Sequence, residues 1–142
     1  MMKEHIVSIG GPKRNRVTRD LIDEIGGRFK FEGDELVDTK TGEKYLPEYD
    51  QKRDFNRVDY GLIIKGYHSS DARKVAFLFA GCHTEGTLGA ASYLSALGRG
   101  EEAYLRQLSR EFGKKAFEIA VRCTFKKDSM NVTFPVGFER IA

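Results

Sequence analysis

The sequence predicts one α/β domain with a mixed sheet and a C-terminal β-hairpin. Three observations favour this fold class. Short apolar runs typical of buried strands alternate with segments whose apolar residues recur at helical spacing. The 142 residues fit a single domain and allow a core that needs no disulfide or metal. No linker, internal repeat or low-complexity tract divides the chain, so we expect residues 1–142 to fold together.

The first third of the chain predicts a strand, a glycine loop, a helix and a meander. Residues 6–9 form an apolar run that ends at the Gly-Gly-Pro turn of residues 10–12. Apolar side chains then recur at helical spacing until two glycines stop the helix at positions 26 and 27. Alternating segments within residues 28–46 predict short strands. Residues 47–58 are polar and lack a sustained period, so we interpret them as a surface loop.

The rest of the chain predicts two central strands, two helices and a closing hairpin. Residues 60–64 and 75–80 are the most apolar runs, and the connection between them is too short for a helical crossover, so we expect antiparallel neighbours. Helical spacing follows at residues 88–97 and again at 101–112. Alternation within residues 117–125 and 131–138 predicts the C-terminal hairpin.

The net charge of +3 is concentrated near the N-terminus. Residues 1–19 carry five basic and one acidic side chain, a balance of +4, whereas the remaining chain carries 19 basic and 20 acidic ones, a balance of −1. Proteins that bind a nucleic-acid backbone usually show a longer basic stripe and a pI above the value of 8.8 found here. The charge pattern therefore argues against nucleic acid and favours a local anion site.

Composition excludes further classes. No apolar run approaches the ~18 residues of a membrane span, and ten phenylalanines with balanced charge argue against disorder. Two cysteines and the absence of a secretory apolar segment indicate a reducing, cytoplasmic setting. Three histidines and two distant cysteines show no zinc spacing, so we expect no metal site, and the sequence indicates no particular cofactor.

The glycine loop after the first strand is the first candidate site. Its glycines let the backbone approach a ligand, and the N-terminus of the following helix favours an anion. The spacing matches neither a dinucleotide fingerprint nor a P-loop. We interpret the loop as an anion or nucleotide site, or else as a turn that Asn15 or Thr18 caps while the cations face solvent. The candidate ligand-binding residues are Gly10, Gly11, Lys13, Arg14, Asn15 and Thr18, with Arg16 and Arg19 nearby.

The loop after the second central strand is the other candidate site. Ligands of open α/β sheets bind outside the carboxyl ends of strands, so both loops share one edge if residues 6–9 and 75–80 run parallel. Either Thr84 or Thr87 could cap the next helix, and the alternative interpretation is a loop of cap and turn residues only. The candidate binding residues are Cys82, His83, Gly86 and Thr87.

Glu85 is the candidate catalytic residue. A carboxylate in a glycine-flanked loop could orient a ribose hydroxyl or assist glycosidic cleavage, although the sequence favours an ordinary solvated glutamate over this role. Cys82 beside His83 is a weak case for a nucleophile and base, because adjacent side chains usually diverge. Asp59 precedes a buried strand and is either a strand-end cap or a third wall of the site. Cys123 is most simply a small core residue.

Four motifs in order carry a family resemblance: Ile-Gly-Gly-Pro-x-x-Asn-x-x-Thr (9–18), Asp-Tyr-Gly-Leu-Ile (59–63), Ala-Gly-x-x-x-x-Gly-Thr (80–87) and Phe-Glu-Ile-Ala-Val-Arg (117–122). Together they resemble a Rossmann-like domain of archaeal S-layer-type proteins and of bacterial proteins with a helix-turn-helix partner. The resemblance spans nearly the whole chain and implies a single-domain, Rossmann-like three-layer fold. The resemblance implies no particular activity. The chain lacks a helix-turn-helix or surface-anchoring segment, which puts DNA binding and cell-wall roles in doubt. The motif positions are Gly10, Gly11, Asn15, Thr18, Gly81, Gly86 and Thr87.

These observations predict a small cytoplasmic domain that binds an anionic small molecule, a nucleotide or nucleotide derivative, at the two glycine loops. The first alternative is a nucleotide-processing enzyme, a glycohydrolase or transferase, that uses Glu85. The second is a protein-interaction or assembly module whose glycine loops are structural. The sequence leaves open whether the protein forms a homo-oligomer.

Overall fold

The structure, a computed structural model, describes residues 5–68, 71–100 and 116–141. Its helices are α1 (Arg16–Ile25) and α2 (Thr84–Gly100). Its strands are β1 (Ile6–Ile9), β2 (Phe29–Glu32), β3 (Glu35–Asp38), β4 (Lys44–Tyr45), β5 (Glu48–Asp50), β6 (Phe55–His68), β7 (Asp71–Gly81), β8 (Phe117–Lys127) and β9 (Thr133–Arg140).

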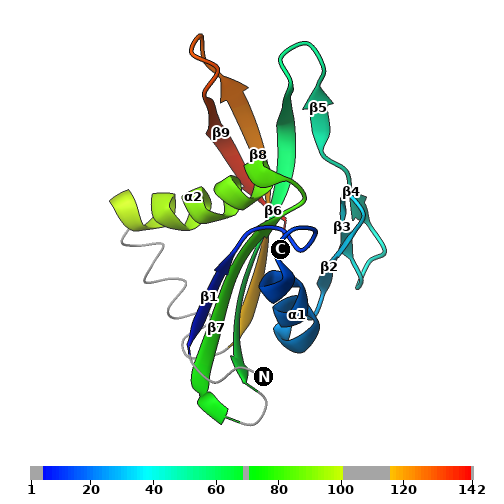
Figure 1. Cartoon of the computed structure of the whole chain (residues 1–142), viewed down its shortest axis with the longest axis vertical. Helices are drawn as coiled ribbons and strands as arrows, with labels where there is room; N and C mark the ends of the chain where they lie inside the picture. Colours follow the sequence, from blue (N-terminus) through cyan, green and yellow to red (C-terminus); the bar gives the residue numbers. More distant parts are fainter. Residues whose placement is uncertain (1–4, 69–70, 101–115, 142) are drawn as a thin grey trace.

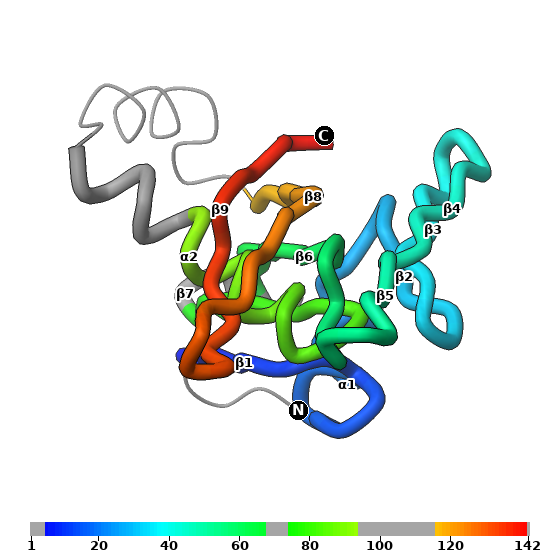
Figure 2. The backbone as a smooth tube through the Cα atoms, turned by 90° about the horizontal axis from the view of Figure 1, so that it is seen from above, coloured from blue at the N-terminus to red at the C-terminus, as the bar shows by residue number. Residues whose placement is uncertain are grey.

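The strands form two sheets. The larger one has the order β1-β7-β6-β8-β9, with β5 beside β6, and the smaller one has the order β2-β3-β4. Figure 2 shows the smaller sheet to one side of the larger one. Strand β1 runs parallel to β7, whereas all other described pairs are antiparallel. The predicted antiparallel central strands and closing hairpin are therefore confirmed, and β1 and β7 run parallel, which is the condition for both loops to share one edge.

The predicted Rossmann-like three-layer fold is wrong. The described part of the structure is mostly β, and its two helices accompany a mixed sheet and a separate smaller one. A Rossmann-like fold needs helical crossovers between parallel strands. Here β6 and β7, and β8 and β9, are joined as antiparallel hairpins instead. The helix predicted over residues 101–112 lies outside the described residues.

The surface loop predicted for residues 47–58 is also wrong, because this segment contains β5 and the start of β6. The two strands form a hairpin whose turn includes Asp54, a residue with a positive φ of 56°. Phe55 and Val58 are buried. The polar residues Asn56 and Arg57 between them hid this strand from a search for apolar periodicity, although Asn56 is itself buried.

The two helices pack on opposite faces of the larger sheet, as Figure 1 shows. Successive residues of a strand point to opposite faces, so β6 contributes to both cores. Leu62 and Ile64 belong to the cluster that contains Leu21 and Ile22 of α1. Ile63 belongs to the cluster that contains Ala90 of α2, with Tyr93 packed against it. The chain therefore leaves β1 toward one face and β7 toward the other.

The smaller sheet is held by the buried Asp38 carboxylate and the half-buried Glu118 carboxylate. Asp38 accepts two hydrogen bonds from the Arg28 guanidinium, at 2.8 and 2.7 Å. Glu118 of β8 accepts the main-chain N–H groups of Arg28 and Phe29, both at 2.9 Å. The Glu118 contacts link the β2–β3–β4 sheet to the larger sheet, and the Arg28–Asp38 pair joins the start of β2 to the end of β3.

The Asp38 pair predicts a specific loss of stability in acid. Hydrogen bonding to Arg28 holds the pKa of Asp38 well below its usual value. The pair's contribution is therefore complete above the unfolded pKa, near 3.8, and is lost as the pH falls below it toward the folded pKa. Denaturant titrations at several pH values should show a smaller acid-induced loss for Asp38→Asn than for the wild type. The exposed control Asp20→Asn should follow the wild type, and identical pH curves for all three proteins would contradict the assignment.

Candidate functional site

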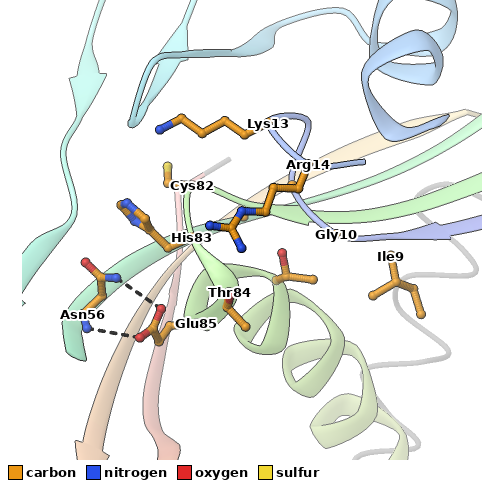
Figure 3. A pocket seen from close by; sticks show the side chains of 12 residues that line it. Ile9, Gly10, Lys13, Arg14, Asn56, Cys82, His83, Thr84 and Glu85 are labelled. Carbon is orange, nitrogen blue, oxygen red and sulfur yellow. Dashed lines mark hydrogen bonds between the residues drawn. The ribbon is translucent and has the colours of Figure 1, made fainter. Parts of the chain in front are cut away.

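The candidate site is a cavity of about 550 Å³ at the carboxyl ends of β1 and β7 (Figure 3). Parallel neighbouring strands whose chains leave toward opposite faces open a crevice outside their ends. Both loops predicted from the sequence meet there. The lining residues are Ile9, Gly10, Gly11, Lys13, Arg14, Asn56, Gly81, Cys82, His83, Thr84, Glu85 and Thr87.

The two glycine loops touch each other. Gly10 has a φ of +130°, a conformation that side chains rarely adopt, and its N–H donates to the Phe79 carbonyl of β7 at 2.9 Å. A Cβ atom on Gly11 would lie 2.6 Å from the Gly81 carbonyl oxygen. The small residues thus let the β1–α1 loop lie directly against the end of β7.

Asn15 and Thr18 hold the first loop in place and do not line the cavity. The Asn15 carbonyl oxygen accepts the Thr18 N–H at 3.1 Å and so caps α1, as predicted. Its amide nitrogen donates to the Ile9 carbonyl at 3.0 Å. The Thr18 hydroxyl is buried against that of Ser8, at 2.7 Å. Asn15 therefore takes one of the N–H groups at the N-terminus of α1, and the first turn of this helix lies outside the cavity lining.

Arg14 is the cation that faces the cavity without a partner. Its guanidinium points toward the second loop in Figure 3, and no hydrogen bond or ion pair connects it to any residue that the structure describes. Lys13, by contrast, forms an ion pair with Asp34 in the β2–β3 turn. Arg16 and Arg19 lie outside this lining.

Asp59, from β6, caps the second helix. One carboxylate oxygen accepts the N–H groups of His83 and Gly86, at 3.0 and 2.6 Å, and the other accepts that of Tyr60 at 2.8 Å. Asp59 is fully buried, and this burial raises its pKa, although the three hydrogen bonds act in the opposite direction. The structure therefore supports the interpretation of Asp59 as a cap. Asp59 takes the capping role that the sequence analysis considered for Thr84 or Thr87.

Gly86 approaches the sheet closely and lies outside the cavity lining. A Cβ atom there would lie 2.3 Å from the Tyr60 carbonyl oxygen and 2.8 Å from the Asp59 carboxylate. The space beside Gly86 that a ligand could have approached is thus filled by β6.

Glu85 is bound to Asn56 of β6. Its two carboxylate oxygens accept the main-chain and side-chain N–H groups of Asn56, each at 3.2 Å (Figure 3). This contact ties the first turn of α2 to the β5–β6 hairpin. The acid–base role of Glu85 stays a prediction, and its carboxylate has a structural part in this contact.

Cys82 and His83 both line the cavity. Burial, together with the nearby Asp59, raises the pKa of the Cys82 thiol far above its usual value, so this thiol stays protonated and is a poor nucleophile at neutral pH. The His83 ring lies between Asp59 and Asp34, with closest N···O distances of 3.8 and 3.6 Å, both too long for hydrogen bonds.

Two buried polar atoms near the cavity have no hydrogen-bond partner among the described residues: His83 Nδ1 and Thr87 Oγ1. Buried polar atoms are nearly always satisfied in folded proteins. Both residues line the cavity. Both atoms are themselves buried, and His83 Nδ1 lies 3.8 Å from the buried Asp59 carboxylate.

The structure brings most of the predicted site residues together. Gly10, Gly11, Lys13, Arg14, Cys82, His83, Glu85 and Thr87 line the cavity, whereas Asn15, Thr18 and Gly86 do not. The lining also includes Ile9, Asn56, Gly81 and Thr84, which the sequence analysis did not select. Ile9, Gly81 and Thr84 adjoin the selected loops, but Asn56 lies in a segment interpreted as a surface loop and carried no signal.

Gly81 provides a test of the close packing between the end of β7 and the first turn of α2. A Cβ atom there would lie 2.2 Å from Thr87 N and 2.3 Å from the Gly86 carbonyl carbon, so the backbone must shift. We expect Gly81→Ala to lower the free energy of unfolding by about 2 kcal/mol, as measured by denaturant titration. The matched control is Gly27→Ala, whose Cβ would meet only Glu118 at 3.7 Å and should change stability by less than about 0.5 kcal/mol. Equal effects of the two substitutions would contradict the close packing at Gly81.

Comparison with protein-family models, curated protein sequences and solved structures finds no match. The resemblance to the Rossmann-like domain of S-layer-type proteins therefore stays a prediction. Among the described residues, no helix combines the length and apolar character needed to cross a membrane. The same residues contain no group of three or more His, Cys, Asp or Glu side chains placed to hold a metal ion.

Proposed function

We propose that the cavity binds an anionic small molecule, a nucleotide or nucleotide derivative, whose phosphate contacts Arg14. The observation that carries this proposal is the Arg14 guanidinium, which faces the cavity without a partner among the described residues. A guanidinium offers several N–H donors in a fixed plane that matches phosphate geometry. The proposal moves the anion away from α1, because Asn15 caps that helix.

The first turn of α2 supplies further donors opposite Arg14. A helix leaves its first N–H groups without intrahelical acceptors, and Asp59 takes those of His83 and Gly86. The N–H groups of Thr84 and Glu85 belong to the same turn and to residues that line the cavity. These groups suit an anion that bridges the two loops.

The size and lining of the cavity fit a ligand larger than a phosphate ion. Sites for small molecules usually occupy about 300–1,000 Å³, and this cavity has a volume of about 550 Å³. Ile9 and Cys82 offer apolar surface for a base or sugar, while Asn56 and Glu85 present an amide and a carboxylate. A nucleotide combines an apolar ring, hydroxyl groups and a phosphate, which matches this mixture.

Two other predictions belong to this proposal. A cytoplasmic location is supported by Cys82 and Cys123, both buried as free thiols, which suits a reducing compartment. The enzyme and interaction-module alternatives stay predictions, and the hydrogen bonds between Glu85 and Asn56 give Glu85 a structural part without catalysis.

Isothermal titration calorimetry tests the proposal directly. The panel contains nucleoside mono-, di- and triphosphates and dinucleotides, with inorganic phosphate as the reference ligand, at moderate salt. We expect at least one nucleotide to bind more tightly than phosphate, because only a nucleotide fills the apolar part of the cavity. The proposal fails if no nucleotide binds more tightly than inorganic phosphate.

A further inference from the structure

A second cavity, of about 290 Å³, adjoins the first one at Lys13. It lies between α1 and the β2–β3 hairpin, and Lys13 lines both cavities. One side chain therefore reaches from the site of the proposed phosphate to the second cavity. A ligand that occupies both cavities must therefore pass Lys13.

The second cavity is basic. Among the described residues, its lining includes the cations Lys13, Arg19 and Lys30 and a single acid, Asp23. The Lys30 ammonium has one long hydrogen bond, to the Ile22 carbonyl at 3.4 Å, and Arg19 has no partner within the described part of the chain. An anionic group in this cavity would be attracted by three cations and repelled by one carboxylate.

We propose that the second cavity is a subsite for the distal phosphate of a nucleoside polyphosphate. This inference rests on the proposed function and names its ligand class as nucleoside di- and triphosphates. Arg14 and the α2 loop contact the phosphate nearest the sugar. The phosphate chain then passes Lys13 and ends beside Arg19 and Lys30. A monophosphate is too short to reach the second cavity.

The position of Lys13 supports a continuous phosphate chain. Lys13 forms an ion pair with Asp34, and both side chains are about half exposed. A pair this exposed is weak, since water and salt screen it. A polyphosphate carries more negative charge than one carboxylate and therefore competes well for the Lys13 ammonium.

The test compares a nucleoside triphosphate with the monophosphate of the same nucleoside by calorimetry, for the wild type and for the double variant Arg19→Gln/Lys30→Gln. We expect the wild type to bind the triphosphate at least tenfold more tightly, and the double variant to lose most of that difference while its affinity for the monophosphate changes less than threefold. The control Lys40→Gln/Lys52→Gln removes the same charge from exposed positions outside both linings and should retain the wild-type preference.

Each other outcome overturns a different claim. If both nucleotides bind and the double variant keeps the triphosphate preference, the subsite is wrong while the proposed function stands. If the control loses the preference as strongly as the double variant, the preference reflects overall charge, and the subsite is again wrong. If neither nucleotide binds the wild type more tightly than phosphate, the proposed function fails and the subsite with it.

Discussion

Replacing Arg14 by alanine is expected to weaken nucleotide binding by about 10- to 100-fold without unfolding the protein. A hydrogen bond to a charged group is worth about 1.5–3 kcal/mol, and each 1.4 kcal/mol corresponds to about tenfold in affinity. Arg14 is exposed and has no partner among the described residues, so its loss removes no described contact. Calorimetry with the tightest nucleotide of the panel measures the effect.

The control for Arg14 is Arg16→Ala. Arg16 carries the same charge two residues further along the chain, is also exposed and does not line the cavity. We expect its effect on affinity to be less than threefold. Arg14→Lys should restore part of the affinity, because an ammonium retains the charge but not the planar donor geometry. Equal losses for Arg14→Ala and Arg16→Ala would show that only general charge attracts the ligand.

Replacing Asp59 by alanine is expected to lower the free energy of unfolding by about 3 kcal/mol or more. The substitution leaves the N–H groups of Tyr60, His83 and Gly86 without their acceptor, and each buried unsatisfied donor costs about 1–3 kcal/mol. It also removes the only carboxylate that the described residues place on these three groups. Denaturant titration measures the loss.

The control for Asp59 is Asp128→Ala. Asp128 also accepts two main-chain N–H groups, those of Met130 and Val132, but these lie in an exposed turn where water can replace the carboxylate. We expect a loss below about 1 kcal/mol there. The loss of stability for Asp59→Asn should lie between those of Asp59→Ala and Asp128→Ala. The asparagine amide retains one acceptor oxygen, but its nitrogen faces N–H donors. An Asp59→Ala variant as stable as Asp128→Ala would contradict the capping role.

The local units of the fold could be predicted from the sequence because their signals are local. The Gly10-Gly11 turn follows an apolar run and precedes a helical spacing, and Asn15 stands at the cap position. Alternation of polar and apolar residues, also a local signal, predicted the β8–β9 hairpin. The layer arrangement could not be predicted this way, because it depends on which strands pair. The pairing of β6 with β8, which are far apart in the sequence, and the separate β2-β3-β4 sheet give a mostly β structure that no local pattern indicated.

The contacts that complete the site join residues far apart in sequence. Asn56 and Glu85 are separated by 29 positions, and Lys13 and Asp34 by 21. No spacing rule connects such pairs. Asp59 carried a partial signal, a carboxylate directly before a buried strand, but only the fold shows that its acceptor oxygens meet α2. The sequence located the two loops, and the structure shows which of their side chains face the cavity.

An NMR titration tests the central claim, that a nucleotide binds where the β1 and β7 loops meet. Uniformly ¹⁵N-labelled protein is titrated with the tightest nucleotide of the panel, and the amide shifts are followed. We expect the largest changes at Gly10, Gly11, Arg14 and the Thr84–Thr87 turn, with the far ends of β1 and β7 unchanged. Saturable changes confined to another surface, or no changes at millimolar nucleotide, would contradict the account.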